Sequence, residues 1–338
     1  MFVPFTPHAR VCVAVVGLGL TPRLRACVDS LAGHATDHEF AIICVVNPTT
    51  RWDSSEPDGL PEGVNVIRPD LNLGWAGGLH AARQETSADY FVWIQEDMVV
   101  LEGWLDALVE AADAIPTGGA FGSVGKSETG EIVLYNAGTA EPADAVQLWN
   151  LTDPTDTALA DEPAAFDWVT SKGMLVRLTA WDEVGGPDPR LYPLNHVDKD
   201  FGTHLRAHGW QNILVPGARH RHEGSMSSPS YFRYFVAPWQ EAEFNARWAS
   251  TVRTMATTPG AVDHECGPWR GQPFAVIEQL VGREASRMLV PMARQLTEWH
   301  RRDLRETQAN LDAVLASRSW RVLAPLRTVV ARLRSASR

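Results

Sequence analysis

The sequence is poor in cysteine, has no long apolar run and carries fewer basic than acidic residues, and each shortage excludes a class of protein. Its four cysteines are scattered, and none has the CxxC spacing typical of zinc sites. No stretch comes near the roughly 18 consecutive apolar residues that a membrane-spanning helix requires, and the amino terminus lacks the apolar core of a signal peptide. We therefore expect reduced core thiols and a cytoplasmic protein.

The charge balance argues against a nucleic-acid partner. Lys and Arg total 30 against 41 Asp and Glu, a net charge of −11, whereas nucleic-acid phosphates are bound by clustered basic residues. The chain of 338 residues is long for one domain. Its composition indicates a body over residues 1–250, a Pro- and Gly-rich linker over 251–274 and an extension over 275–338.

The first part of the chain alternates strand and helix patterns. Val11–Val16 is a Val-rich run typical of a strand covered on both faces, and Thr21 followed by Pro22 predicts the start of a helix. Phe40–Val46 predicts a second strand and Val64–Ile67 a short third one. This order favours an α/β fold with a mostly parallel central sheet between helices.

The next apolar strand pattern is Tyr90–Ile94. Gln95 follows it, and then come two acids. Ligands bind at the carboxyl ends of strands in such sheets, and carboxylate oxygens suit Mg²⁺ or Mn²⁺. Glu96 and Asp97 are therefore candidates to meet a cation and its phosphate ligand. The alternative is that both acids only begin a turn.

A glycine-rich stretch runs from Asn72 to Gly78 and leads into a helix. Glycines allow close approach of a ligand, and the N–H groups at a helix amino terminus favour phosphate. A plain turn explains the same pattern. Further along, residues 140–165 form a long acidic segment rich in Ala and Pro, which predicts a loop.

A resemblance to a known family begins at Ser171-Lys172-Gly173-Met174-Leu175-Val176-Arg177, followed by Trp181-Asp182-Glu183-Val184-Gly185-Gly186-Pro187-Asp188. This pattern resembles the inverting glycosyltransferases of family 2, which have a Gly-initiated strand ending in Arg and then a Val-Gly-Gly-Phe-Asp-like turn. Pro187 replaces the usual Phe. The resemblance spans roughly residues 11–248. It implies a GT-A type nucleotide-diphospho-sugar transferase fold, with residues 10–115 binding the nucleotide sugar and 116–250 the acceptor, followed by the helical extension.

The resemblance also assigns roles to the earlier motifs. The family's Asn-x-Gly-x-Ala-Gly-Gly stretch is matched by Asn72, Gly74, Ala76, Gly77 and Gly78. Its acidic DxD-type motif resembles Gln95-Glu96-Asp97, with Gln in place of the first Asp. This implies Asp97 as a ligand of Mn²⁺ or Mg²⁺, with Glu96 and Gln95 as secondary candidates. Gly173 joins the residues implied to bind the nucleotide sugar.

Asp198 and His222 complete the implied machinery. The stretch from Asn195 to Phe201 resembles the family's segment that carries the catalytic base, which places Asp198 as that base. The alternative is that Asp198 and Asp200 only begin a helix, where acids stabilise by about 0.3–1 kcal/mol. His222 fits a His-x-Gly-x-x-Ser element that binds the metal or diphosphate, and His220 remains the alternative.

One departure concerns the nucleotide base. The family has an Asp after the second strand, whereas this chain has Asn47 there and no acid until Asp53. Asn47 could hydrogen-bond a pyrimidine edge, but the base stays open among UDP-, dTDP- and GDP-sugars.

The resemblance implies an enzyme of class EC 2.4 that moves a hexosyl or deoxyhexosyl group. The donor would be a nucleotide-diphosphate sugar, and the acceptor a hydroxyl of a cell-surface glycan, lipid-linked by expectation. Metal-assisted single displacement with Asp198 as base would invert the anomeric carbon. The alternative is a catalytically degenerate module that binds nucleotide sugar or glycan as an assembly protein.

The carboxyl-terminal extension has its own pattern. Residues 275–316 show helical apolar spacing, interrupted by Pro291, which predicts an amphipathic helix packed on the body or on a second copy in a homodimer. Residues 318–338 contain arginines and no acids. We expect this tail to contact the cytoplasmic face of an anionic membrane; the alternative is a solvated basic end.

Overall fold

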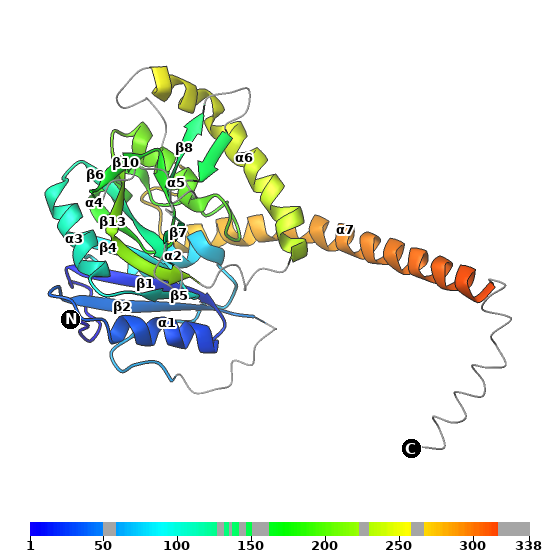
Figure 1. The fold of residues 1–338 in the computed structure, drawn as a ribbon, viewed down its shortest axis with the longest axis horizontal. Coiled ribbons are helices and arrows are strands. Elements are labelled where there is room, and N and C mark those ends of the chain that lie inside the picture. Colours follow the sequence, from blue (N-terminus) through cyan, green and yellow to red (C-terminus); the bar gives the residue numbers. More distant parts are fainter. Residues whose placement is uncertain are drawn as a thin grey trace. The chain divides into compact units, whose positions relative to one another are not determined.

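The computed structural model describes residues 1–49, 59–126, 132–134, 137–141, 147–150, 162–222, 230–257 and 267–316. The chain divides into two units, Met1–Ala285 and Ser286–Arg338, and each is described by itself (Figure 1). Unit 1 contains the sheet and nearly all of the helices. Within the described residues, none of the helices combines enough length and apolar character to cross a bilayer.

A ten-stranded sheet of the described residues forms the centre of unit 1, in the order β10-β13-β6-β12-β4-β1-β2-β3, with β5 paired to β13 and β7 to β6. Its strands are β1 Val11–Leu18, β2 Phe40–Asn47, β3 Asn65–Ile67, β4 Tyr90–Gln95, β5 Met98–Val100, β6 Gly118–Lys126, β7 Ile132–Leu134, β10 Ala164–Phe166, β12 Met174–Arg177 and β13 Gln211–His222. The predicted α/β fold is confirmed. The sheet is mixed rather than mostly parallel, because β12 runs antiparallel between β4 and β6.

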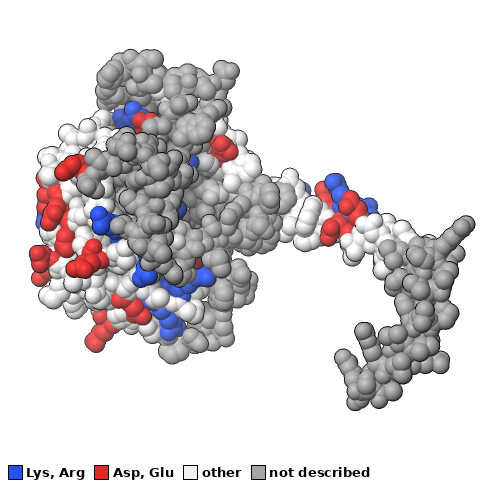
Figure 2. Space-filling model, in the orientation of Figure 1, with Lys and Arg blue, Asp and Glu red and all other residues white. Residues whose placement is uncertain are grey.

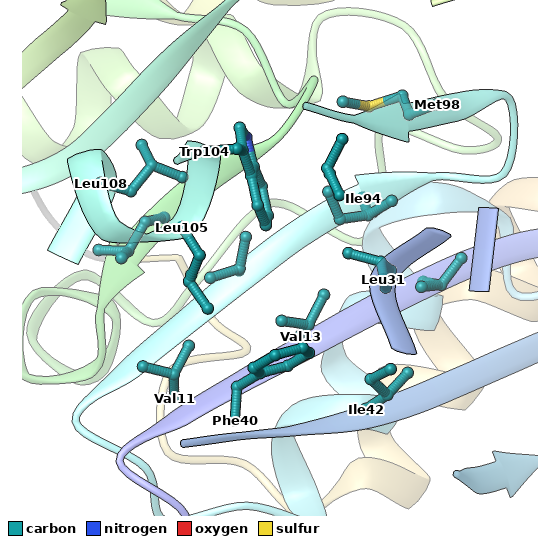
Figure 3. Close-up of a cluster of buried hydrophobic side chains, with 14 of the residues drawn as sticks. Val11, Val13, Leu31, Phe40, Ile42, Ile94, Met98, Trp104, Leu105 and Leu108 are labelled. Carbon is teal, nitrogen blue, oxygen red and sulfur yellow. The ribbon is translucent and has the colours of Figure 1, made fainter. Parts of the chain in front are cut away.

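Helices cover both faces of this sheet (Figure 1). The helices of unit 1 are α1 Pro22–Ala32, α2 Gly74–Gln84, α3 Trp104–Ala114, α4 Leu178–Val184, α5 Val197–Ala207 and α6 Ser230–Thr257. Successive strand residues point to opposite faces, so Val11, Val13 and Val15 pack with α1 and α3, whereas Cys12 and Ala14 pack with α2, α4 and α5. Figure 3 shows the first core, with Trp104 and Leu108 of α3 over the strands.

Local sequence explains where these elements begin. Thr21 caps α1 as predicted, since its hydroxyl accepts the Leu24 N–H at 3.1 Å and Pro22 fills the first turn. The described cysteines, Cys12, Cys27 and Cys44, are buried free thiols, as expected. Burial raises the pKa of Cys12 and of Cys44 to about 12, which makes these thiols unreactive.

The acidic segment over residues 140–165 contains more structure than a loop. β8 Ala137–Glu141 and β9 Gln147–Asn150 form an antiparallel pair, and β11 Trp168–Val169 completes a second sheet. The prediction of a loop was therefore wrong for residues 140–141, 147–150 and 164–165. Its Ala- and Asp-rich composition hid these strands, because β-propensity depends on the neighbouring strand more than on the residue itself.

Unit 2 begins inside a long helix, α7 Phe274–Ala316, which continues through Pro291 instead of breaking there. Large apolar side chains of the stretch 286–316 are exposed, including Trp299 at 54% and Leu304 at 69%. Figure 2 shows basic and acidic side chains next to one another along this stretch. A homodimer stays a prediction, and the predicted membrane-binding tail, residues 318–338, lies outside the described residues.

Candidate active site

Five segments meet at one edge of the sheet. β1, β2 and β4 run parallel, so Leu18, Asn47 and Gln95 leave the sheet on the same side. β12 is antiparallel to β4, which brings the residues just before Met174 to this edge. β13 is parallel to β6 and ends there at His222. The segments singled out from the sequence therefore gather at the edge where ligands bind in such sheets.

Asp97 and His222 form the centre of this edge. The turn after β4 carries Asp97, and β5 then pairs with β13 so that Met98 lies opposite His222. Asp97 Oδ1 is 3.1 Å from His222 Nε2, and both side chains are largely buried. Burial alone would raise the pKa of Asp97, but the hydrogen bond and charge of His222 outweigh it, so the pKa lies below its usual value.

His220, the alternative to His222, has a different environment. Its Nδ1 lies 2.8 Å from Ser123 Oγ, and the residue is fully buried. Burial, with the charges of His222 and Lys172, lowers the pKa of His220 to about 3, so its ring is neutral. The structure therefore brings His222, and not His220, into contact with Asp97.

Gln95 connects this pair to Asp198. Its Oε1 lies 3.2 Å from His222 Nε2, and its Nε2 donates to Ser171 Oγ at 3.3 Å. The Ser171 N–H in turn donates to Asp198 Oδ2 at 3.1 Å. Sequence reasoning missed Ser171, although its place beside the family-like Lys172-Gly173 run was a signal. This series of contacts thus links Asp97 and His222, which are expected to act on the donor, to Asp198, which is expected to act on the acceptor.

Asp198 and Asp200 both lie in the first turn of α5, but they face different surroundings. Asp198 is partly exposed and accepts the N–H of Lys199 at 2.9 Å. Asp200 is fully buried and bonds Trp248 Nε1 at 2.7 Å and Arg247 at 2.5 Å, both on α6. Asp198 is therefore the acid of this helix start that an acceptor can reach.

Asn47 and Glu96, predicted to bind the nucleotide sugar, make contacts within the protein. Asn47 is buried, its Oδ1 accepts the Leu73 N–H at 2.9 Å, and its Nδ2 donates to Gly74 O. Glu96 Oε2 accepts the Leu18 N–H at 2.8 Å. Asn47 thus joins β2 to the start of α2, and Glu96 braces the turn after β1.

The glycines of the Asn72–Gly78 stretch lie inside the first turns of α2 rather than in a loop before it. A Cβ at Gly74, where φ is +65°, would lie 2.6 Å from the Pro193 carbonyl oxygen. One at Gly78 would lie 2.6 Å from Val16, and one at Gly77 2.9 Å from Val281. Close packing thus requires these glycines whatever they bind. Asn72 caps this turn, since its Oδ1 accepts the Gly74 N–H.

Gly173 is required for a similar reason. Its φ is +68°, and a Cβ there would lie 2.6 Å from Ser123 Oγ. The bend at Gly173 carries Ser171 and Lys172 to the site just before β12 begins.

The donor atoms present suit a hard divalent cation. Asp97 Oδ1 and Gln95 Oε1 both lie within 3.2 Å of His222 Nε2, so oxygen and imidazole ligands converge. Over the part of the chain that the structure describes, there is no group of three His, Cys, Asp or Glu that could hold a metal by itself. A cation here would need further oxygens, which is the usual case for Mg²⁺ or Mn²⁺ bound through substrate phosphates.

Solved structures with the same fold identify its type. GalNAc-T7, solved with UDP, GalNAc and Mn²⁺, matches with a TM-score of 0.54 and 13% identity over 84% of this chain and 55% of its own. The mannosyltransferase PcManGT from Pyrobaculum calidifontis, in complex with GDP-Man and Mn²⁺, matches with a TM-score of 0.50 and 14% identity over 95% and 84%. The fold is therefore of the GT-A type.

The sequence comparison identifies a similar family. Residues 20–177, just under half of the chain, match glycosyl transferase family 2. Curated relatives from two strains of Mycobacterium tuberculosis are N-acetylglucosaminyl-diphospho-decaprenol L-rhamnosyltransferases, 27% identical over 207 residues. This match covers 52% of the present chain and 66% of each relative, so the chain spans just under two thirds of those proteins.

Proposed function

We propose that this protein is an inverting glycosyltransferase that moves a sugar from a nucleotide diphosphate to a hydroxyl of a cell-wall glycan. The observation that carries the proposal is the chain of contacts from Asp97 and His222 through Gln95 and Ser171 to Asp198. The match of residues 20–177 to glycosyl transferase family 2 and the GT-A fold support it. A lipid-linked acceptor is supported by the diphospho-decaprenol acceptor in the curated relatives' name.

The residues divide the reaction between them. Asp198 accepts the proton of the acceptor hydroxyl as that oxygen forms a bond to the anomeric carbon, while the bond from this carbon to the diphosphate oxygen breaks. Asp97, His222 and Gln95 are the residues that would hold Mn²⁺ or Mg²⁺. The cation, when bound, supplies positive charge that stabilises the departing diphosphate. Attack opposite the leaving group inverts the anomeric carbon.

The first test is a panel of UDP-, GDP- and dTDP-sugars with Mn²⁺ or Mg²⁺ and glycan acceptors, scored by nucleotide release and product formation. Turnover of one donor with transfer to an acceptor supports the proposal and names the nucleotide. Binding of one donor without any turnover would replace the enzyme by the binding-module alternative.

Loss of Asp97 or His222, the two residues proposed as metal ligands, is expected to abolish most of this turnover. Asp97→Ala and His222→Ala each remove one ligand, and we expect kcat to fall about 100-fold or more, in line with the loss of a group that stabilises developing charge. Arg221→Met is the matched control, because Arg221 lies between His220 and His222 on β13 and is exposed. Calorimetric titration with Mn²⁺ in the presence of a nucleoside diphosphate should show loss of metal binding in these two variants only. Unchanged binding in both would exclude this metal site.

Gln95→Leu is expected to affect both metal binding and the action of Asp198 as the base. The leucine keeps the volume but removes the hydrogen bonds to His222 and Ser171, and groups that orient metal ligands contribute 10- to 100-fold. We expect about 10-fold weaker activation by Mn²⁺ together with a lower kcat. Ser171→Ala removes the Oγ contacts with Gln95 and with Asp198 but keeps the backbone N–H bond to Asp198 and the bond from Gln95 to His222. It should therefore lower kcat and leave Mn²⁺ activation unchanged. Identical profiles for the two variants would contradict the separate roles of the two hydrogen bonds.

A further inference from the structure

Two lysines flank the backbone contacts that hold Asp198. Lys172 follows Ser171, which bonds Asp198 Oδ2, and Lys199 directly follows Asp198 and bonds its Oδ1 through the backbone. The Lys199 ammonium lies 4.6 Å from the centre of the Trp168 ring. Both lysines are partly buried, and Asp198 is the acid that acts most strongly on each.

These ammonium groups lack the partners that buried charges usually have. Among the described residues, neither Nζ atom takes part in an ion pair or a hydrogen bond. Burial lowers the pKa of both lysines, which measures the cost of keeping them charged there. An anionic ligand between the lysines would offset this cost.

The two lysines differ in their second neighbours. Lys172 also interacts with Asp97, so it lies toward the proposed metal ligands Asp97 and His222. Lys199 interacts with Glu241 of α6 instead and contacts Trp168, so it lies toward the part of the site formed by α5, α6 and β11. The hydroxyl that reacts must touch Asp198, so an acceptor that enters between α5, α6 and β11 would pass Lys199.

We propose that Lys172 and Lys199 form a phosphate-binding pair around Asp198 that takes the diphosphate of the acceptor. This inference rests on the proposed transferase function. An acceptor whose sugar carries a diphosphate would present its hydroxyl to Asp198 and its phosphates, one sugar ring away, to the lysines.

The test compares two acceptors in the full-length protein at saturating donor and Mn²⁺. One is a hexose linked through diphosphate to a short prenyl chain, and the other is the same hexose on a neutral alkyl chain of equal length. Lys172→Met and Lys199→Met should each raise KM for the diphosphate acceptor about 10- to 100-fold, as expected for one lost hydrogen bond to a charged group. KM for the neutral acceptor and for the donor should stay within about twofold. Lys199→Arg should retain most of the affinity.

Other outcomes overturn the inference. A rise in donor KM in both variants would assign the lysines to the leaving diphosphate, and an equal rise for both acceptors would assign them to folding. If the wild type transfers to neither acceptor, the transferase proposal fails separately. Calorimetry with the diphosphate acceptor then decides the anion site: about 10-fold weaker binding by both methionine variants supports it, and equal binding refutes it.

Discussion

Replacing Asp198 by Asn is expected to lower kcat by about 10²- to 10⁴-fold, the usual contribution of a general base. The asparagine keeps the size of the side chain and one acceptor oxygen, so the start of α5 is largely retained, but it cannot take up the acceptor proton. Donor binding at Asp97 and His222 does not use Asp198, and the donor Kd should therefore change little. Rapid-quench measurement of sugar transfer separates the chemical step from product release.

Asp200→Asn is the matched control for this variant. Asp200 lies two residues further along the same helical turn, is fully buried and bonds Arg247 and Trp248, so it does not touch substrate. We expect this variant to lose stability but to keep kcat within about 10-fold at temperatures well below its Tm, because it lies outside the proton-transfer path. A reversed ranking, with Asp200→Asn the less active, would assign the base to Asp200.

Much of the sheet could be predicted because its signals are local. The apolar runs of β1, β2 and β4 and the Thr21-Pro22 helix start each depend on a few neighbouring residues, and the structure confirms them. β8 and β9 were missed because their composition gives a weak strand signal. β8 also pairs with β11, which lies beyond β9 on the chain, and periodicity does not register such a contact.

The site could be predicted in its residue types but not in its connections. The family resemblance singled out Asp97, Asp198 and His222, and their roles stay predictions until variants are measured. The resemblance also proposed ligand contacts for Asn47 and Glu96, whose hydrogen bonds within the fold depend on the packing of β1 and α2. Ser171 and the lysine pair become visible only when β12, β13 and α5 converge, since each is ordinary in its own segment.

Arg247→Met is expected to lower the free energy of unfolding by about 3–5 kcal/mol, the cost of removing one partner of a buried ion pair. Arg247 on α6 bonds two fully buried carboxylates, Asp200 at 2.5 Å and Asp188 in the turn after α4. Burial works against its charge, but the two aspartates together raise the pKa of Arg247. Methionine fills a similar volume, and Arg190 still pairs with Asp188, so the loss falls mainly on Asp200.

Urea unfolding followed by tryptophan fluorescence measures this loss, with Arg10→Met as the control. Arg10 also pairs with an aspartate, Asp113, but both side chains are more than 40% exposed. Exposed pairs contribute about 0–1 kcal/mol, so the control should remain near the wild type. A loss below about 1 kcal/mol for Arg247→Met would show that the buried pair contributes no more than a surface pair.

The pH dependence of the loss identifies its cause. Burial raises the pKa of Asp200 above the ordinary 3.8 even with Arg247 present, and removal of Arg247 should raise it further. Between the unfolded and folded pKa values the native state binds more protons than the unfolded state, so stability falls as pH rises through that window. The deficit of Arg247→Met should therefore be largest at neutral pH and shrink as pH falls toward 5. Adding Asp200→Asn removes the unpaired charge and should restore part of the stability at neutral pH, whereas a deficit that does not change with pH would point to lost packing of α6 on α5.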